Sequence, residues 1–191
     1  RAGQLDYVEI MTATIEEQAL IKYKTRQEIV TVKGVRDDFH ELSRIEDILV
    51  GQGIFMLHDD VAQYGIVGIG LAHRLDCGIQ SVLPFELYVP RSGARINMAN
   101  PAQSLSSAEF FSPGVLFQVD QAKYDDNYVL VSLELARTLF GTGGKVSALE
   151  LKLDGTVRVK KAKKELEKIL GDDYRVLDRY EQQEDVLRIV K

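Results

Sequence analysis

The sequence predicts an α+β protein. Alternating and β-branched runs typical of strands occur early in the chain, most clearly over residues 27–33. Residues 64–89 have the pattern of a strand, a short helix and a second strand. Residues 156–170 carry apolar side chains at helical spacing. The chain has 191 residues, of which 45% are hydrophobic, and this is enough to form a buried core.

The first fifty residues predict two strands and a short helix. The strands are expected over residues 5–13 and 19–33, with residues 14–18 forming either a helical turn or a loop between them. A polar segment over 37–47 predicts a short helix. Residues 48–53 then predict a strand fragment that a glycine turn closes.

Glycines define the next segment, residues 64–78. Gly68 and Gly70 begin a dinucleotide-binding fingerprint, but His73 occupies the position of its third glycine. A tight strand-to-helix turn explains the glycines better than a cofactor does. We expect Gly78 to end the helix in the left-handed conformation.

The middle of the chain predicts a projecting connection. A strand over residues 82–89 is followed by about twenty residues without a clear period, extending to Ser107. Because this stretch has few apolar anchors, residues 91–108 are expected to be mobile. Residues 110–119 then predict one strand, which a Pro-Gly pair interrupts.

The last third of the chain alternates between strands and helices. In order, the sequence predicts a turn at 125–127, a strand at 128–131, a helix from the N-cap Ser132 to Phe140 that Gly141 ends, a strand at 145–153, a helix at 156–170, a strand at 174–177 and a helix from Glu181.

The charge distribution excludes nucleic acid as a partner. The net charge is −5 at pH 7, whereas phosphate backbones require clustered cations. The one lysine-rich face belongs to the helix at 156–170 and includes Lys160, Lys161, Lys163, Lys164 and Lys168. Because Glu165 and Glu167 alternate with these lysines, a solvated face is favoured over binding of anionic lipid or a protein partner.

No residues with a catalytic, cofactor-binding or metal-binding pattern stand out. Three histidines share no ligand spacing, and paired aspartates occur where turns are expected. Residues 141–145 are similar to a phosphate loop but lack its first glycine and its final serine or threonine. The single cysteine, Cys77, excludes a disulfide within the chain.

Three segments resemble a known family. Residues 32–39, 69–75 and 128–141 are similar to the extracytoplasmic domain of ABC transporter permeases, in the MacB-like, FtsX-like and lipoprotein-releasing group. The resemblance implies a discontinuous porter-like βαβ lobe, residues 1–45 and 145–191, and an inserted sabre-like mixed α/β lobe, residues 46–144. It also implies a position at the periplasmic face of the bacterial inner membrane, between two membrane helices.

The resemblance implies a non-catalytic role without a cofactor. A cytoplasmic ATPase would act on the domain through the transmembrane part, and a second permease copy or a relative would complete the transporter. A periplasmic carrier or a lipoprotein would meet the projecting connection, where the candidate docking residues are Pro90, Arg91, Arg95, Met98 and Pro101.

Two alternatives remain open. The first is a free-standing α+β protein that binds a small ligand in a pocket beside Gly68 and Gly70. The second is a nucleotide-dependent enzyme, which only the incomplete glycine patterns favour.

Overall fold

The computed structural model describes residues 5–91, 104–178, 180 and 181. The chain divides into two compact units. Unit 1 combines Arg1–Met11 with Leu151–Lys191, and unit 2 is Thr12–Glu150. By their contacts, residues 12–45 therefore belong to the same unit as the middle of the chain. The lobe boundaries expected at 45/46 and 144/145 stay a prediction.

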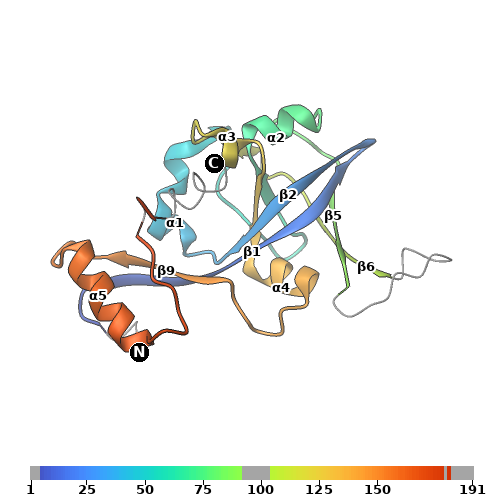
Figure 1. Ribbon diagram of the computed structural model, residues 1–191. Helices are drawn as coiled ribbons and strands as arrows, with labels where there is room; N and C mark the ends of the chain where they lie inside the picture. Colours follow the sequence, from blue (N-terminus) through green and yellow to red (C-terminus); the bar gives the residue numbers. More distant parts are fainter. Residues whose placement is uncertain (1–4, 92–103, 179, 182–191) are drawn as a thin grey trace, which may run out of the picture. The chain divides into compact units, whose positions relative to one another are not determined.

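Two long strands, β1 (Val8–Tyr23) and β2 (Arg26–Val35), form a hairpin (Figure 1). The predicted break at residues 14–18 is wrong, because these residues lie inside β1. They pair with β2 from Ile15 opposite Gly34 to Gln18 opposite Thr31. The ladder supplies backbone partners that the local sequence does not reveal.

The main sheet has seven strands and mixed direction. Its order is β4 (Gly65–Val67), β8 (Tyr128–Ser132), β2, β1, β5 (Phe85–Pro90) and β6 (Leu105–Phe110), and β9 (Ala148–Leu153) also pairs with β1. The β2–β8 pair is parallel, whereas β1–β2, β1–β5, β4–β8 and β5–β6 are antiparallel. A mixed sheet combined with helices in the same chain confirms the predicted α+β class.

A second, two-stranded sheet pairs β3 (Leu49–Gly51) with β7 (Val115–Phe117). The prediction of one interrupted strand over 110–119 is therefore wrong, because β6 ends in the main sheet and β7 begins in the small one. Pro113 has no amide hydrogen for a ladder, and Gly114 has a φ of +82°. These two residues change the chain's direction between the sheets.

In the described part of the chain, α5 (Val159–Leu170) is the longest helix, with 12 residues, and the other helices have eight residues or fewer. These are α1 (Phe39–Ser43), the 3₁₀ helix η2 (Ile45–Ile48), α2 (Ile69–Arg74), α3 (Ala122–Asp125) and α4 (Leu133–Phe140). The ends of α4 confirm the prediction: the Ser132 Oγ accepts a hydrogen bond from the Leu135 amide at 3.1 Å, and Gly141 is left-handed with a φ of +61°.

Two predictions about element ends are wrong. The left-handed residue after α2 is Asp76, with a φ of +54°, rather than Gly78. Aspartate tolerates this conformation better than most residues. Residues 174–177 form no strand, and Tyr174 is exposed. The predicted helix from Glu181 lies almost entirely outside the described residues.

The core of unit 2 occupies both faces of the main sheet. Successive strand residues point to opposite faces. Val129 and Val131 accordingly join the larger apolar cluster, which includes residues of α2 and α4. Ile66 and Leu130 join a second cluster with residues of α1, η2 and β7.

Candidate functional site

The predicted docking loop begins at the end of the β5–β6 hairpin. Pro90 pairs with Leu105 in the ladder. The Arg91 amide donates to the Ser104 carbonyl at 2.9 Å, and its Nε donates to the Leu105 carbonyl at 3.0 Å. Pro90 and Arg91 are therefore fixed at the base of the connection, and both are exposed.

Three of the five docking candidates, Arg95, Met98 and Pro101, lie outside the described residues. The connection is also shorter than predicted at its far end. Residues 105–108 belong to β6, where Leu105 faces Pro90 and Ala108 faces Leu87 across the ladder. The predicted mobile stretch 91–108 therefore overlaps an ordered strand at its last four residues.

The glycines at 68 and 70 allow two backbone segments to approach closely. A Cβ on Gly68 would lie 2.2 Å from the Asp125 carbonyl oxygen, and a Cβ on Gly70 would come 1.9 Å from the Asp126 Oδ1. Chain atoms therefore occupy the space that a bound phosphate would need beside these glycines. The structure explains the pair by packing against the α3 segment.

Residues 141–145 also have a structural explanation. Gly141, Gly143 and Gly144 all have positive φ angles. The Lys145 amide donates to the Thr142 carbonyl at 3.0 Å, which closes a tight turn directly after α4. This geometry agrees with the predicted helix end followed by a turn.

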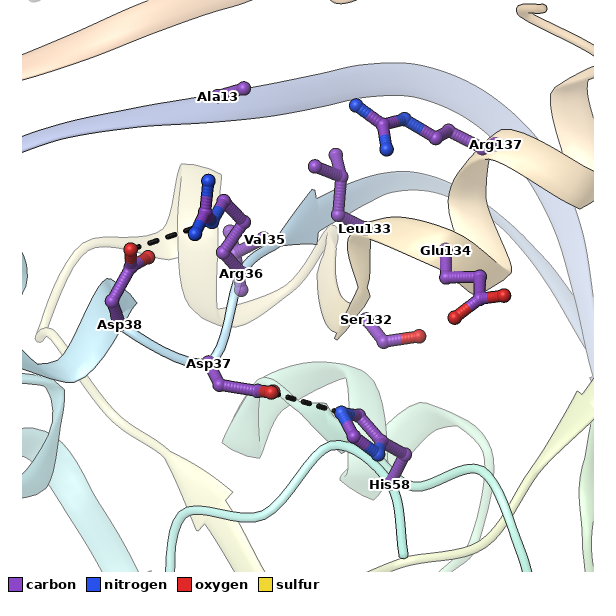
Figure 2. Close-up of a pocket in the computed structure, with 10 residues that line it drawn as sticks. All are labelled: Ala13, Val35, Arg36, Asp37, Asp38, His58, Ser132, Leu133, Glu134 and Arg137. Carbon is purple, nitrogen blue, oxygen red and sulfur yellow. Dashed lines mark hydrogen bonds and ion pairs between the residues drawn. The ribbon is translucent and has the colours of Figure 1, made fainter. Parts of the chain in front are cut away.

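A polar pocket lies in unit 2 beside the N-terminal end of α4 (Figure 2). Its volume is about 430 Å³. The residues that line it are Ala13, Val35, Arg36, Asp37, Asp38, His58, Ser132, Leu133, Glu134 and Arg137. They come from β1, the end of β2, the following turn, the loop before β4, the end of β8, and α4.

One hydrogen bond and one ion pair cross one side of the pocket. The His58 Nε2 lies 3.0 Å from the Asp37 Oδ2, and the Arg36 Nε lies 3.4 Å from the Asp38 Oδ2 (Figure 2). The Thr12 hydroxyl also donates to the Asp38 Oδ1 at 3.1 Å. The paired aspartates, which the sequence indicated only as turn residues, thus hold the β2–α1 turn to its neighbours.

The other side of the pocket belongs to α4. The Glu134 carboxylate and the Arg137 guanidinium point apart (Figure 2). The Ser132 hydroxyl donates to the Gln63 Oε1 at 2.8 Å while it caps the helix. Its hydrogen bonds serve the helix end and an amide side chain, which is not the arrangement of a base-activated nucleophile.

A charge network that the sequence did not reveal lies on the sheet. The Lys33 Nζ is 3.2 Å from the Glu16 Oε1 and 2.5 Å from the Glu150 Oε1. Burial lowers the pKa of Lys33, but the two carboxylates outweigh this effect and the net pKa is raised. The network joins residues 117 positions apart, so no local pattern could have indicated it.

The described residues contain neither a metal cluster nor a membrane span. Within residues 5–91, 104–178, 180 and 181, no group of three or more His, Cys, Asp or Glu side chains could hold a metal ion. No helix in the same ranges is long and apolar enough to cross a bilayer. Burial raises the pKa of the Cys77 thiol to about 11, so this side chain is a poor nucleophile.

The fold has counterparts among solved structures, although the sequence matches no protein-family model and no curated protein. It is similar to the extracellular domain of the noncanonic ABC-type transporter YknZ from Gram-positive bacteria, with a TM-score of 0.58 and 16% identity over 90% of this chain and 79% of that one. It is also similar to the periplasmic region of MacB from Actinobacillus actinomycetemcomitans, with a TM-score of 0.50 and 11% identity over 88% and 68% of the two chains. The predicted resemblance is therefore confirmed at the level of the fold.

Proposed function

We propose that the chain is the extracytoplasmic domain of a MacB/YknZ-type ABC transporter permease. The observation that carries this proposal is the fold likeness, which extends over 90% of this chain for YknZ and 88% for MacB. The sequence supports it independently, because residues 32–39, 69–75 and 128–141 resemble the same group of permeases. The domain would face the periplasm or the cell exterior.

The proposed role is mechanical and non-catalytic. ATP hydrolysis by a cytoplasmic ATPase would move the domain through flanking membrane helices, and a second permease copy or a relative would form the other half of the transporter. The cargo would be a lipoprotein or another envelope substrate. The Ser132 hydroxyl, which lines the pocket, is engaged in two structural hydrogen bonds, and this supports a non-catalytic role.

The finer lobe assignment belongs to the same proposal. A porter-like lobe would combine residues 1–45 with 145–191, and a sabre-like lobe would comprise 46–144. Unit 1, which joins Arg1–Met11 to Leu151–Lys191, supports a discontinuous lobe made from both parts of the chain.

Cysteine labelling tests the location of the domain. Val61 is 92% exposed, so Val61→Cys places a reactive thiol on the surface of unit 2. In intact cells that produce the complete protein, a membrane-impermeant maleimide should label this variant. The wild type is the matched control, because within these 191 residues the one thiol, Cys77, is half-buried and has a raised pKa.

The opposite labelling pattern would refute the proposal. If Val61→Cys reacts only after the cells are lysed, the domain does not face the outside. For an organism with an outer membrane, the same comparison is made in spheroplasts. Labelling of denatured protein shows in each case that the thiol is present.

The docking loop is proposed as the contact for the carrier or cargo. Pro90 and Arg91 anchor its base, and Arg95, Met98 and Pro101 are its candidate contact residues. Arg95→Glu combined with Met98→Glu should reduce transport in cells while the amount of assembled transporter stays normal. Val61→Glu, a change at a residue of unit 2 that is 92% exposed, serves as the control. Unchanged transport in the double variant would exclude a docking role for these side chains.

A further inference from the structure

Helix α5, the longest helix among the described residues, has two chemically different faces. Ala162 and Leu166, four residues apart, are buried in unit 1. Lys160, Lys164 and Lys168 are also spaced by four residues, on the opposite side, and all three are exposed. Lys161 is exposed as well and extends this lysine stripe, which we define as Lys160, Lys161, Lys164 and Lys168.

The acidic residues of α5 have partners other than the lysine stripe. Glu167 lies 3.8 Å from the Nζ of Lys163, which also pairs with Glu181 at 2.5 Å. Glu165 lies beside the Tyr7 phenol, whose pKa is raised by burial and by this carboxylate. The two carboxylates of α5 therefore adjoin the lysine stripe but interact with Lys163 and Tyr7.

The result is a cationic surface on an acidic protein. Within the described part of the chain, none of the four stripe lysines forms an ion pair, although the whole sequence has a net charge of −5. Helix α5 is shown in orange in Figure 1. Four cations within three helical turns, none of them held in an ion pair with a described residue, are complementary to a dense anionic surface.

We propose that the lysine stripe binds the anionic phospholipid headgroups of the membrane in which the transporter is anchored. This inference rests on the proposed function, which makes a membrane surface the neighbour of this domain. In the proposed function the porter-like lobe, residues 1–45 and 145–191, would lie beside the membrane, and α5 belongs to this lobe. The ammonium groups bind phosphate oxygens through charge and hydrogen bonds.

Vesicle binding by the 191-residue chain tests the inference. Sucrose-loaded vesicles of phosphatidylcholine with about 30% phosphatidylglycerol should sediment the protein at low salt, whereas pure phosphatidylcholine vesicles should not. Each lysine near such a surface contributes about fivefold to the partition coefficient, so Lys160→Gln with Lys164→Gln and Lys168→Gln should weaken binding on the order of 100-fold.

A matched variant distinguishes a specific stripe from general electrostatics. Lys24→Gln with Lys123→Gln and Lys145→Gln changes the net charge by the same amount in unit 2. This control should bind the anionic vesicles like the wild type. Circular dichroism shows that both triple variants are folded.

Two outcomes would overturn the inference. One is the absence of binding to anionic vesicles by the wild type, and the other is an equal loss of binding in both triple variants. If maleimide labelling places the domain outside the cytoplasm while vesicle binding fails, the proposed function stands and only the lipid contact is wrong.

Discussion

At Gly68 the absence of a side chain lets the backbone of Asp125 pack directly against the glycine. Its Cβ position lies 2.2 Å from a backbone oxygen, which cannot rotate away as a side chain would. Gly68→Ala should therefore lower the free energy of unfolding by about 1–3 kcal/mol, as overpacking does in cores. Urea denaturation measures this change.

Gly78 provides the control for this substitution. Nothing lies within 4 Å of its Cβ position, and its φ is not in the left-handed region. Gly78→Ala should therefore leave stability unchanged or raise it by about 0.5 kcal/mol through the unfolded state. Equal losses at both positions would show that close approach at Gly68 is not the cause.

Asp59 gives unit 2 a pH-dependent contact. Its carboxylate accepts hydrogen bonds from the amides of Val61 and Ala62 and from the Tyr64 hydroxyl, and these bonds lower its pKa from 3.8. A depressed folded-state pKa stabilises the protein above the unfolded-state value and loses this effect as the pH falls through the folded-state value. The wild type should therefore exceed Asp59→Ala in melting temperature above about pH 5, by a margin that shrinks below pH 3.8.

Thermal melts between about pH 2.5 and 7 measure this margin, in the range where carboxylates titrate. Asp60→Ala is the control, because it removes an adjacent, exposed carboxylate that makes none of these three bonds. A margin between Asp59→Ala and wild type that stays constant with pH would contradict the assignment.

At the scale of elements, α4 depends on its first side chain. Ser132 caps the helix and also donates to the Gln63 Oε1. Ser132→Ala should cost about 1–2 kcal/mol, near the upper range for loss of an N-cap, because the Gln63 carbonyl also loses its donor. Gln63→Ala keeps the cap and should cost less than Ser132→Ala. Chemical denaturation of both variants decides between the two contributions.

Elements with local signals could be predicted from the sequence, and elements with distant partners could not. Helix α4 has its cap, its apolar stripe and its terminal glycine within ten residues, so its ends agree with the prediction. Strand β1 continues through residues 14–18 only because β2 lies beside it. Residues 174–177 have a strand pattern but no ladder, and β6 and β7 separate because their partners belong to different sheets.

The candidate site follows the same rule. Pro90 and Arg91 could be placed beside a projecting connection, because two strand patterns flank it. The polar pocket combines β1, β2, a loop and α4, so its members are close only in the folded chain. The partners of the carboxylates on α5 could not be predicted from the sequence either. Glu165, for example, interacts with Tyr7, which is far from it in sequence.

At the scale of the whole molecule, the two units differ in their buried apolar content. Both large apolar clusters are composed of unit 2 residues, whereas α5 in unit 1 buries Ala162 and Leu166. Segments with fewer buried contacts open at lower free energy. Native-state hydrogen exchange should therefore be at least roughly tenfold faster in peptides from α5 than in peptides from β8 and α4. Equal protection would indicate that both units open only together.

The single half-buried thiol has a consequence for maturation. With a pKa of about 11, fewer than about one Cys77 side chain in a thousand is a thiolate near neutral pH. In the folded domain Cys77 therefore exchanges slowly with other disulfides. With one cysteine, these 191 residues can form no disulfide among themselves and need no oxidoreductase for one. Its yield should be the same in cells with and without disulfide-forming catalysts.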